Sequence, residues 1–398
     1  MRQLCRSSLG SIESSGLSTI LKVPCQHTFG APALGSPNVI QVVSQEREII
    51  MKFACGIISN TKYVHRTLIF FTLLAVAVLQ PAAGQSLTIK NLGTLPGGNQ
   101  SQAVAINERG QVVGYSFDAR GDQHASLFED GRIIDLHTLP GGDTLSAAYG
   151  INSRGQVAGY SFNSSGYPRA TVFEKGQVID LGTLPGGDNS AANAINDRGQ
   201  VVGWSFNAGR ASQAFLFEDG VMTNLGTLPG GYFSGANGIN DRGQVVGWAT
   251  ASDDNYHAIL FEHGAVRDLG LLPGCNSSVA YGINNRGQIV GSSAAASGDQ
   301  HAFLYEHGVM TDLGTLPGGN KSAAYGINER GQIVGSSNTA SGWQQHAFLY
   351  EHGVMTDLGT LPGDDQSIAQ GINNRGQVAG YSAPDSSVWH AVLWTRER

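Results

Sequence analysis

Residues 312–319 read Asp-Leu-Gly-Thr-Leu-Pro-Gly-Gly, and near-copies of this stretch recur along most of the chain. The leucine before the proline marks each copy, at Leu95, Leu139, Leu184, Leu228, Leu272, Leu316 and Leu361. Consecutive copies are 44 or 45 residues apart, and everything after residue 85 follows this period. A fixed period of this length indicates a repeat architecture in which each copy is one supersecondary unit.

The repeat at residues 322–358 contains four segments with the composition of β-strands. An Asn-Glu-Arg-Gly turn follows the first segment, a variable loop follows the second, and a His-Gly pair separates the last two. Gly adopts positive φ in such turns without steric cost, and a two-residue turn is typical of a β-hairpin. No segment keeps helical periodicity for three turns. We therefore predict an antiparallel meander with strands at 322–328, 332–336, 346–351 and 354–358.

Four-stranded antiparallel units of this length are the blades of β-propellers. A solenoid is the alternative, although its coils do not need two tight hairpins per period. Six copies contain all four strands, whereas the seventh ends after its third strand, near Trp394. Residues 87–92 precede the first copy as an isolated fourth strand. The sequence thus predicts an all-β, seven-bladed β-propeller of four-stranded antiparallel blades, closed by the N-terminal strand so that no sheet edge stays open.

The strand order also predicts the placement of each segment. The first strand of every copy is rich in Ala and Gly, which suit a crowded axis, so it is expected to be innermost. The Leu-Pro-Gly-Gly loops and the variable loops would then lie on one face, and the tight turns on the other.

The first 84 residues lack the repeat and have the organisation of a targeting segment. A basic flank precedes the uncharged, mostly apolar residues 67–79, and Ala82-Ala83-Gly84 follows them. This pattern is typical of a secretory signal peptide, with a signal anchor as the alternative. We predict that residues 1–50 are disordered or precede a true start at Met51, that 51–84 are a signal peptide, and that 85–398 form a secreted or extracellular propeller.

Composition limits the partners of the repeat region. The chain has 24 Lys and Arg against 31 Asp and Glu, of which the first 84 residues hold 7 and 3. The remaining 17 and 28 give the repeats a net charge of −11, with no basic cluster along the sequence. This balance argues against nucleic acid and anionic membrane surfaces as partners. Cys275 is the one cysteine of the repeats, so they contain no disulfide.

The third strand of each copy opens with His, Arg or Gln, and the fourth ends near Asp or Asn. A two-residue turn makes these positions diagonal cross-strand neighbours on one face. Where the first becomes Gln213, the second becomes Asn224, and this matched change indicates a strand-fastening hydrogen bond rather than a metal site. Zinc would need three or four converging ligands. The predicted structural pairs are His124/Asp135, Arg169/Asp180, Gln213/Asn224, His257/Asp268, His301/Asp312 and His346/Asp357, with His390 facing Asn91.

Aromatic residues that vary between copies are the candidates for ligand binding. The inner-strand residues Tyr149, Tyr281 and Tyr325 would line the channel mouth, where the other copies carry Val, Asn or Gln. The loops add Tyr167, Tyr256, Trp343, Trp389, Tyr232 and Phe233. Exposed aromatic rings stack on sugar rings or anchor a protein partner. The aromatic residues near the end of each second strand are instead expected to pack between blades.

No residue pattern indicates catalysis or a cofactor. Asp253-Asp254 and Asp364-Asp365 are the acidic doublets of the repeats, and neither has a neighbour that completes a catalytic pair or triad. Phosphate loops, zinc motifs and nucleophile elbows do not occur. The Gly-Gly loops offer one or two oxygen-bearing side chains each, fewer than the six to eight oxygens that calcium takes. We assign no catalytic residue, metal ligand or cofactor.

The repeats resemble the extracellular HAF-repeat family of bacteria, which is named for a His-Ala-Phe triplet. The triplet opens His-Ala-Phe-Leu-Tyr-Glu at His301 and His346, and Ile-Asn-x-Arg-Gly-Gln segments lie between copies. The resemblance covers residues 86–398. It implies export and a bacterial source, but no particular activity.

These observations favour a secreted, non-catalytic propeller that binds glycan or protein through its loop face. We expect a monomer with no membrane span in its mature chain. One alternative is a propeller-type polysaccharide hydrolase or lyase that uses acidic loop residues such as Asp254 and Asp364. Another is a purely structural cell-surface protein.

Overall fold

The computed structural model describes residues 87–142, 145–340, 342, 344–384 and 388–396. They belong to the second of the two units into which the chain divides, Gly84–Arg398. The predicted signal peptide and the segment before it lie outside the described residues. The described part of the chain forms 28 β-strands and contains no helix with the length and hydrophobicity of a membrane span.

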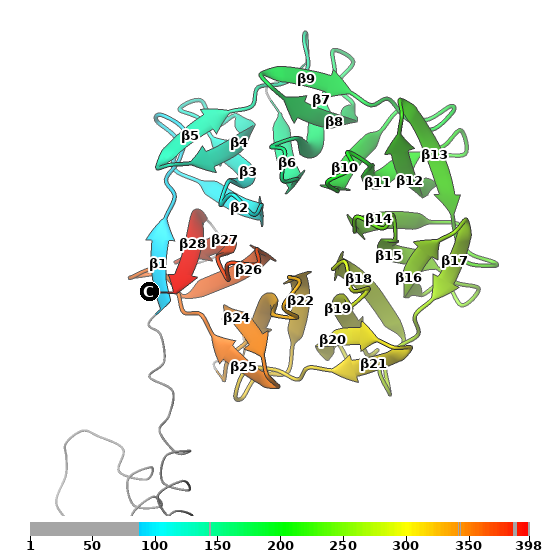
Figure 1. The fold of residues 1–398 in the computed structure, drawn as a ribbon, viewed down its shortest axis with the longest axis vertical. Coiled ribbons are helices and arrows are strands. Elements are labelled where there is room, and N and C mark those ends of the chain that lie inside the picture. The colour runs from blue at the N-terminus through cyan, green and yellow to red at the C-terminus, as the bar shows by residue number, and fades with distance from the viewer. Residues whose placement is uncertain (1–86, 143–144, 341, 343, 385–387, 397–398) are drawn as a thin grey trace, which may run out of the picture. The chain divides into compact units, whose positions relative to one another are not determined.

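The strands form seven four-stranded antiparallel sheets, which are arranged as blades around a central channel (Figure 1). Blades 1 to 6 each use four consecutive strands, from β2–β5 to β22–β25. Blade 7 combines β26, β27 and β28 with the N-terminal β1. The predicted fold is therefore confirmed, including the number of blades.

In the order of blades 1 to 7, the strands run from the channel outward as follows. The inner strands are β2 (Ser101–Ile106), β6 (Ser146–Ile151), β10 (Ser190–Ile195), β14 (Ser234–Ile239), β18 (Ser277–Ile283), β22 (Ser322–Ile327) and β26 (Gln366–Ile372). The second strands are β3 (Val112–Phe117), β7 (Val157–Phe162), β11 (Val201–Phe206), β15 (Val245–Thr250), β19 (Ile289–Ala294), β23 (Ile333–Asn338) and β27 (Val378–Ala383). The third strands are β4 (Gln123–Glu129), β8 (Pro168–Glu174), β12 (Ser212–Glu218), β16 (Tyr256–Glu262), β20 (Gln300–Glu306), β24 (Gln345–Glu351) and β28 (His390–Arg396). The fourth strands are β5 (Arg132–Asp135), β9 (Gln177–Asp180), β13 (Val221–Gly226), β17 (Ala265–Asp268), β21 (Val309–Asp312), β25 (Val354–Asp357) and β1 (Leu87–Asn91).

The N-terminal strand closes the ring, as the sequence predicts. β1 pairs antiparallel with β28, with Leu87 opposite Arg396 and Ile89 opposite Trp394. Trp394 is fully buried, and Leu87 and Ile89 pack against the core cluster that contains it. Removal of β1 would therefore expose apolar surface as well as an unpaired sheet edge.

The hydrophobic core lies between the blades. Each second strand begins with small apolar residues that are buried, because neighbouring blades cover both faces of the sheet. Val245 packs in a cluster shared with blade 3, and the next residue, Val246, packs in a cluster shared with blade 5. Successive strand residues point to opposite faces, so each pair of apolar residues joins a blade to both of its neighbours.

The antiparallel order gives the propeller two different faces. The upper face carries the Leu-Pro-Gly-Gly loops and the loops between second and third strands. The lower face carries the Asn-x-Arg-Gly turns and the two-residue turns. In one such turn Gly331 has φ of 79°, the left-handed conformation that the sequence pattern predicts.

A ring of buried asparagines joins all seven blades at the lower face. Asn196 is 4% exposed, and its Nδ2 donates to the Asn240 carbonyl oxygen of the next blade at 3.0 Å. The same Nδ2 donates to Gln200 Oε1 at 2.6 Å, while Asn196 Oδ1 accepts the backbone N–H of Gln200 at 2.9 Å. Equivalent inter-blade bonds continue around the ring and close it from Asn373 to the Asn107 carbonyl oxygen at 3.1 Å. The ring consists of Asn107, Asn152, Asn196, Asn240, Asn284, Asn328 and Asn373.

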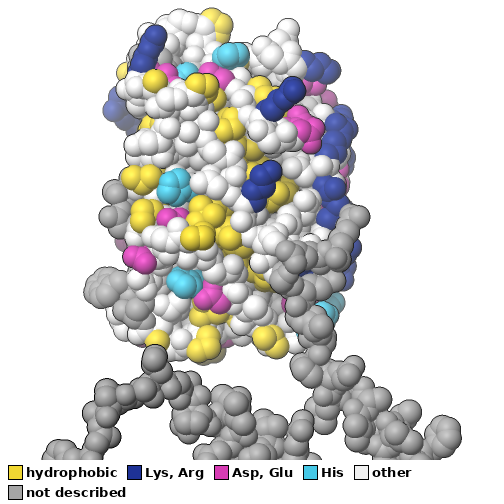
Figure 2. Space-filling view, turned by 90° about the vertical axis from the view of Figure 1, so that its left-hand side faces the viewer, with side chains coloured by type: hydrophobic (Ala, Val, Ile, Leu, Met, Phe, Trp, Pro, Cys, Tyr) yellow, Lys and Arg dark blue, Asp and Glu magenta, His cyan; other side chains and the backbone are white. Residues whose placement is uncertain are grey.

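The Asn-x-Arg-Gly turns also supply positive charge at the lower face. Each turn arginine is exposed, so the fold collects seven arginines on one face although the sequence contains no basic cluster. They are Arg109, Arg154, Arg198, Arg242, Arg286, Arg330 and Arg375. A view from the side shows Lys and Arg side chains gathered along one edge of the molecule (Figure 2).

Candidate functional site

Every inner strand carries a β-bulge at the same position. In blade 3 the pairing register shifts between Ala192 and Ala194, which leaves Asn193 without a cross-strand partner. A bulge re-aims the side chain of the extra residue, and here all seven bulged residues line the upper cavity of the channel. This bulge tier consists of Val104, Tyr149, Asn193, Asn237, Tyr281, Tyr325 and Gln370.

The upper cavity has a volume of about 500 Å³, and its lining changes with depth. An Ala or Gly follows the bulged residue in each strand, and an isoleucine follows that. None of the lining residues is charged. The isoleucine tier consists of Ile106, Ile151, Ile195, Ile239, Ile283, Ile327 and Ile372. A second cavity of about 230 Å³ opens toward the lower face and is lined by five of the same isoleucines.

The bulge tier departs from sevenfold regularity, and the second strands change with it. In blade 5 the large residue is on the inner strand, where Tyr281 hydrogen-bonds Ser292 of β19. In blade 3 the large residue is on the second strand, where Trp204 of β11 accompanies the smaller Asn193. Blade 6 repeats the first arrangement with Tyr325 and Ser336, and blade 4 repeats the second with Asn237 and Trp248.

Ring pairs that include a second-strand residue lie on one sector of the upper side, whereas blades 5 and 6 hold a ring pair on their inner strands, Tyr281 with Tyr325. Each of blades 1 to 4 holds a ring pair with its centroids 5.0–6.2 Å apart: Tyr115 with Phe117, Tyr160 with Phe162, Trp204 with Phe206, and Trp248 with Tyr256. We call these eight residues the aromatic arc. Blades 5 and 6 have Ser292 and Ser336 in place of the inner ring.

A side pocket of about 330 Å³ opens within the arc, between blades 2 and 3. Its lining includes the rings of Tyr149, Tyr160 and Trp204 and the amide of Asn193. From the sequence we expected Tyr160 and Trp204 to pack between blades, and the pocket gives them an accessible face as well. The sequence feature that could have indicated this accessible position is that the two residues vary between copies.

Burial keeps the tyrosines of this region protonated. Loss of solvent raises the pKa of Tyr115 and Tyr149, and burial likewise raises the pKa of Tyr281 and Tyr325. In blade 7 burial raises the pKa of Tyr381 to about 12. A protonated phenol donates and accepts hydrogen bonds but does not serve as a nucleophile or general base near neutral pH. These tyrosines are therefore suited to a neutral polar ligand.

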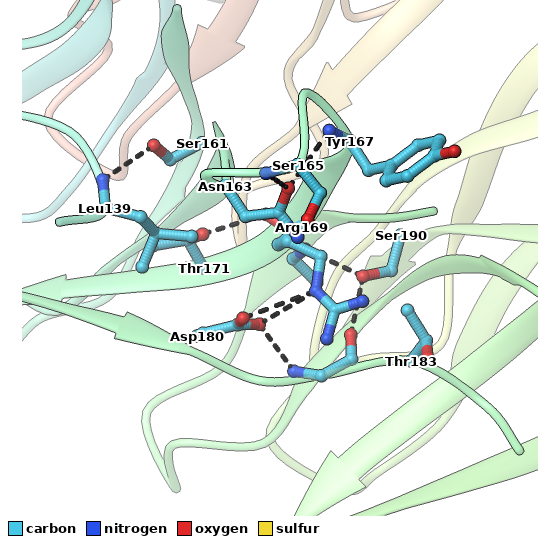
Figure 3. A network of polar contacts seen from close by, with 12 residues as sticks. Leu139, Ser161, Asn163, Ser165, Tyr167, Arg169, Thr171, Asp180, Thr183 and Ser190 are labelled. Atoms are coloured by element: carbon cyan, nitrogen blue, oxygen red, sulfur yellow. Dashed lines mark hydrogen bonds and ion pairs between the residues drawn. The ribbon is translucent and has the colours of Figure 1, made fainter. Parts of the chain in front are cut away.

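The strand-fastening pairs lie outside the lining of the channel. Arg169 Nε is 3.3 Å from Asp180 Oδ2, and Asp180 Oδ1 accepts the backbone N–H of Gly182 at 2.8 Å (Figure 3). One carboxylate thus holds both the third strand and the turn after the fourth. The other distances are 3.1 Å for His124/Asp135, 2.7 Å for His257/Asp268, 2.8 Å for His301/Asp312, 2.7 Å for His346/Asp357 and 3.4 Å for Gln213/Asn224.

Blade 7 differs from the predicted pairing. His390 is paired with Asp364 instead of Asn91, with Nδ1 and Oδ2 3.5 Å apart. Asp364 stands where most copies have the second Gly of the loop, and a Cβ on the equivalent Gly187 would lie 1.9 Å from a backbone carbonyl oxygen. Blade 7 accommodates the side chain because its inner strand begins one residue earlier, as it also does after Cys275 in blade 5.

The loop aromatics predicted from the sequence are mostly exposed. Tyr232 is 70% exposed, Tyr256 50%, Phe233 45% and Tyr167 43%. Of these, Tyr256 belongs to the aromatic arc through its contact with Trp248. Trp389 is half-buried, and Trp343 lies outside the described residues.

The acidic residues of the upper loops cap turns and do not line the upper cavity. Among the described residues, one group has ligand atoms close enough to hold a metal ion, namely Asp118, Asp122 and His124. Within it Asp118 Oδ1 accepts the backbone N–H groups of Arg120 and Asp122 at 2.8 and 3.0 Å. These bonds lower the pKa of Asp118, the Asp122 amide most. This carboxylate already serves the loop between β3 and β4.

No protein-family model matches the chain, and no curated protein matches it. Among solved structures, the chain is similar to the β-propeller domain of the Trilobed protease from Pyrococcus furiosus, with 11% identity and a TM-score of 0.50 over 75% of this chain and 95% of that one. It is also similar to a puromycin hydrolase, with 14% identity and a TM-score of 0.50 over 74% of this chain and 52% of that one. The SapL1 lectin, solved with alpha methyl fucoside, gives 13% identity and a TM-score of 0.40 over 65% and 95%. At these identities the likeness extends to the propeller fold alone.

Proposed function

We propose that this protein binds a neutral carbohydrate at the upper mouth of its channel and does not transform it. The observation that carries the proposal is the side pocket within the aromatic arc, whose uncharged lining shares Tyr149 and Asn193 with the upper cavity. Blades 5 and 6 lack these rings. Ser292 and Ser336 replace the inner ring there, so the rings of this sector are one place where the upper side departs from sevenfold symmetry.

The side chains of this sector are complementary to both the apolar and the polar parts of a sugar ring. A sugar ring has an apolar C–H face, which a flat aromatic side chain covers, and a periphery of hydroxyl groups, which amides and phenols satisfy as donors and acceptors. The side pocket offers both, since Asn193 and Tyr149 adjoin the rings of Tyr160 and Trp204. An ionised ligand would lose hydration there without gaining a partner of opposite charge.

The same lining supports binding rather than hydrolysis. Glycosidases use two carboxyl groups roughly 5 to 10 Å apart on either side of the scissile bond. Neither the upper cavity nor the side pocket is lined by a carboxylate. Asp364, one of the acidic candidates, is turned toward His390 with 6% of its side chain exposed.

We further propose that the propeller is secreted after removal of residues 51–84. The apolar run at 67–79, its basic flank and the small residues that end at Gly84 support this. N-terminal sequencing of protein recovered from culture medium should begin at Gln85. A mature N-terminus well before that residue would contradict cleavage.

A protein partner is the second candidate, favoured by one observation. Tyr232 and Phe233 are exposed in the loop between blades 3 and 4, where all six other loops carry Asn or Asp after the Gly-Gly position. Exposed adjacent rings are typical anchors of protein interfaces. If this candidate is correct, Tyr232→Ala is the substitution that disrupts binding.

Calorimetric titration with a panel of neutral oligosaccharides tests the carbohydrate proposal. We expect Trp204→Ala to weaken binding roughly tenfold or more, because the stacking surface is lost. Trp204→Phe, which keeps a ring, should retain most of the affinity, and Tyr232→Ala should retain all of it. If no neutral saccharide binds, or if Trp204→Ala binds as tightly as the parent, carbohydrate binding at this site is wrong.

A further inference from the structure

The loop between β3 and β4 brings two carboxylates and an imidazole together in blade 1. Asp118 and Asp122 stand opposite each other at the base of the turn, where the Asp118 backbone N–H donates to the Asp122 carbonyl oxygen at 3.0 Å. His124 follows Asp122 by two residues, so the side chains of the two point to the same side of the hairpin. One ligand atom from each of the three residues lies within 4.8 Å of the other two. A single ion can therefore contact all three side chains.

His124 is the member of this group whose bonding capacity is unused. Only 15% of its side chain is exposed, and neither ring nitrogen is accessible to solvent or has a hydrogen-bond partner among the described residues. Nδ1 is 3.1 Å from Asp135 Oδ2, whereas Nε2 is 4.0 Å from Asp118 Oδ2, too far for a hydrogen bond. With or without its proton, Nε2 is a buried polar atom that faces a gap, and such an atom costs free energy until another group bonds it.

The loop itself requires only one oxygen of Asp118. Asp118 Oδ1 accepts two backbone N–H groups of the loop, at 2.8 and 3.0 Å. In blade 2 Asn163 Oδ1 makes the same pair of bonds at 3.0 and 3.1 Å, and in blade 3 Asn207 Oδ1 makes them at 2.9 and 3.1 Å. A neutral amide is therefore sufficient for the cap, and the cap does not use Asp118 Oδ2.

The combination of these residues occurs in blade 1 alone. The positions equivalent to Asp118 carry Asn, Ala, Thr or Pro in the other six repeats. Three carboxylates, those of Asp118, Asp122 and Asp135, adjoin the one imidazole, and Arg120 of the same loop offsets one of their charges. Carboxylates placed opposite each other across a hairpin repel. A cation between them would remove this repulsion.

We propose that Asp118 Oδ2, a carboxylate oxygen of Asp122 and His124 Nε2 bind one divalent transition-metal ion, Zn²⁺ or an ion of similar chemistry. Zn²⁺ lies about 2 Å from its nitrogen and oxygen ligands, so it fits into the 4.0 Å between Oδ2 and Nε2. An imidazole ligand disfavours Mg²⁺ and Ca²⁺, which take oxygen ligands. Asp135 faces the other ring nitrogen, as a carboxylate commonly does behind a metal-bound histidine. This site is independent of the proposed carbohydrate binding.

Calorimetric titration of the tag-free, chelator-treated protein with Zn²⁺ tests the site. We expect one ion per chain and a rise in melting temperature, because the ion binds the folded state. Asp135→Asn should weaken Zn²⁺ binding about tenfold, and loss of a direct ligand should weaken it more. The direct-ligand variants are Asp118→Asn, Asp122→Asn and His124→Gln, each of which introduces the residue that another blade has at the same position, namely Asn163, Asn255 and Gln213. Without metal they should melt no lower than the parent.

His301→Gln is the matched control. His301 is paired with Asp312 in the same way, at 2.8 Å, but Ala295 stands where blade 1 has Asp118. This variant should bind Zn²⁺ as tightly as the parent. In the parent, Zn²⁺ should also shift the imidazole nitrogen NMR signals of His124, and in Asp118→Asn it should not.

The site is wrong if Zn²⁺ does not bind. It is equally wrong if Zn²⁺ binds the direct-ligand variants as tightly as the parent, because the protein then holds an adventitious ion only. If Ca²⁺ or Mg²⁺ binds more tightly than Zn²⁺, the assignment to a transition metal is wrong.

Discussion

The lower and upper faces come from the same seven repeats, yet one keeps the sevenfold pattern and the other does not. At the lower face every blade supplies the same asparagine to the inter-blade ring. Three residues before these asparagines, inside the inner strands, the bulge tier holds three tyrosines, two asparagines, a valine and a glutamine. Ring closure needs the same bond in each blade, so the uniform asparagines are structural. The varied bulge tier is the part of the inner strands to which we assign the proposed ligand site.

Removal of β1 should have the largest effect, because it breaks a uniform feature at the one place where the chain closes the ring. Deletion of residues 86–92 takes the fourth strand from blade 7 and uncovers Trp394. We expect a loss of about 5 kcal/mol or more in unfolding free energy, a large share of the stability of an ordinary domain. Calorimetric melting would measure it.

A chain that begins at Gly84 is the control for this deletion. It retains β1 and should melt at the temperature of the full-length protein. If the shorter chain without residues 86–92 melts at that temperature too, the N-terminal strand does not hold the ring closed.

A comparison of Asn196→Ala with Asn193→Ala contrasts the lower-face ring and the upper-side bulge tier within one blade. The first substitution leaves the buried carbonyl of Asn240 and the amide of Gln200 without their partner, which we expect to cost about 2–4 kcal/mol. The second removes one half-buried bond, from Asn193 Nδ2 to the Ala236 carbonyl oxygen, and should cost about 1 kcal/mol. Urea denaturation of both variants gives the values. Equal losses would mean that the bulge tier is as structural as the asparagine ring.

The sequence was sufficient to predict the number of blades and their closure, because both depend on local patterns. The period and the tight turns define a blade, and a seventh copy that lacks its last strand implies that residues 87–92 supply it. The pairs such as His346/Asp357 were also predictable, since a two-residue turn fixes which side chains meet.

Features that depend on contact between blades were not predicted. All seven asparagines were visible in the sequence, but six of them bond a carbonyl 44 or 45 residues away, and Asn373 bonds that of Asn107 across the ring closure. The bulges contain no characteristic turn residue from which the sequence would predict them. To predict the pairing of His390 with Asp364, two facts about the loop would have been needed. The second loop Gly normally lies against a backbone carbonyl, and the inner strand of blade 7 begins one residue earlier than most.

An exchange of side chains between the two kinds of blade should have the smallest effect on stability and sharpens the comparison most. In blade 6 Tyr325 covers Ser336, and in blade 3 the corresponding residues are Asn193 and Trp204. Ser336→Trp alone should overpack a buried site and cost about 1–3 kcal/mol. Tyr325→Asn alone should lose the contact of its ring with Tyr281.

The double variant should be destabilised by less than the sum of the two single variants, because it restores the blade 3 arrangement. We expect a coupling free energy of about 1–3 kcal/mol from urea denaturation of the parent, the two single variants and the double variant. Additive destabilisation would mean that the bulge tier and the second strand vary independently. The difference between blades 3 and 6 would then be sequence drift, not a coupled exchange of a large residue on one strand for a large residue on the other.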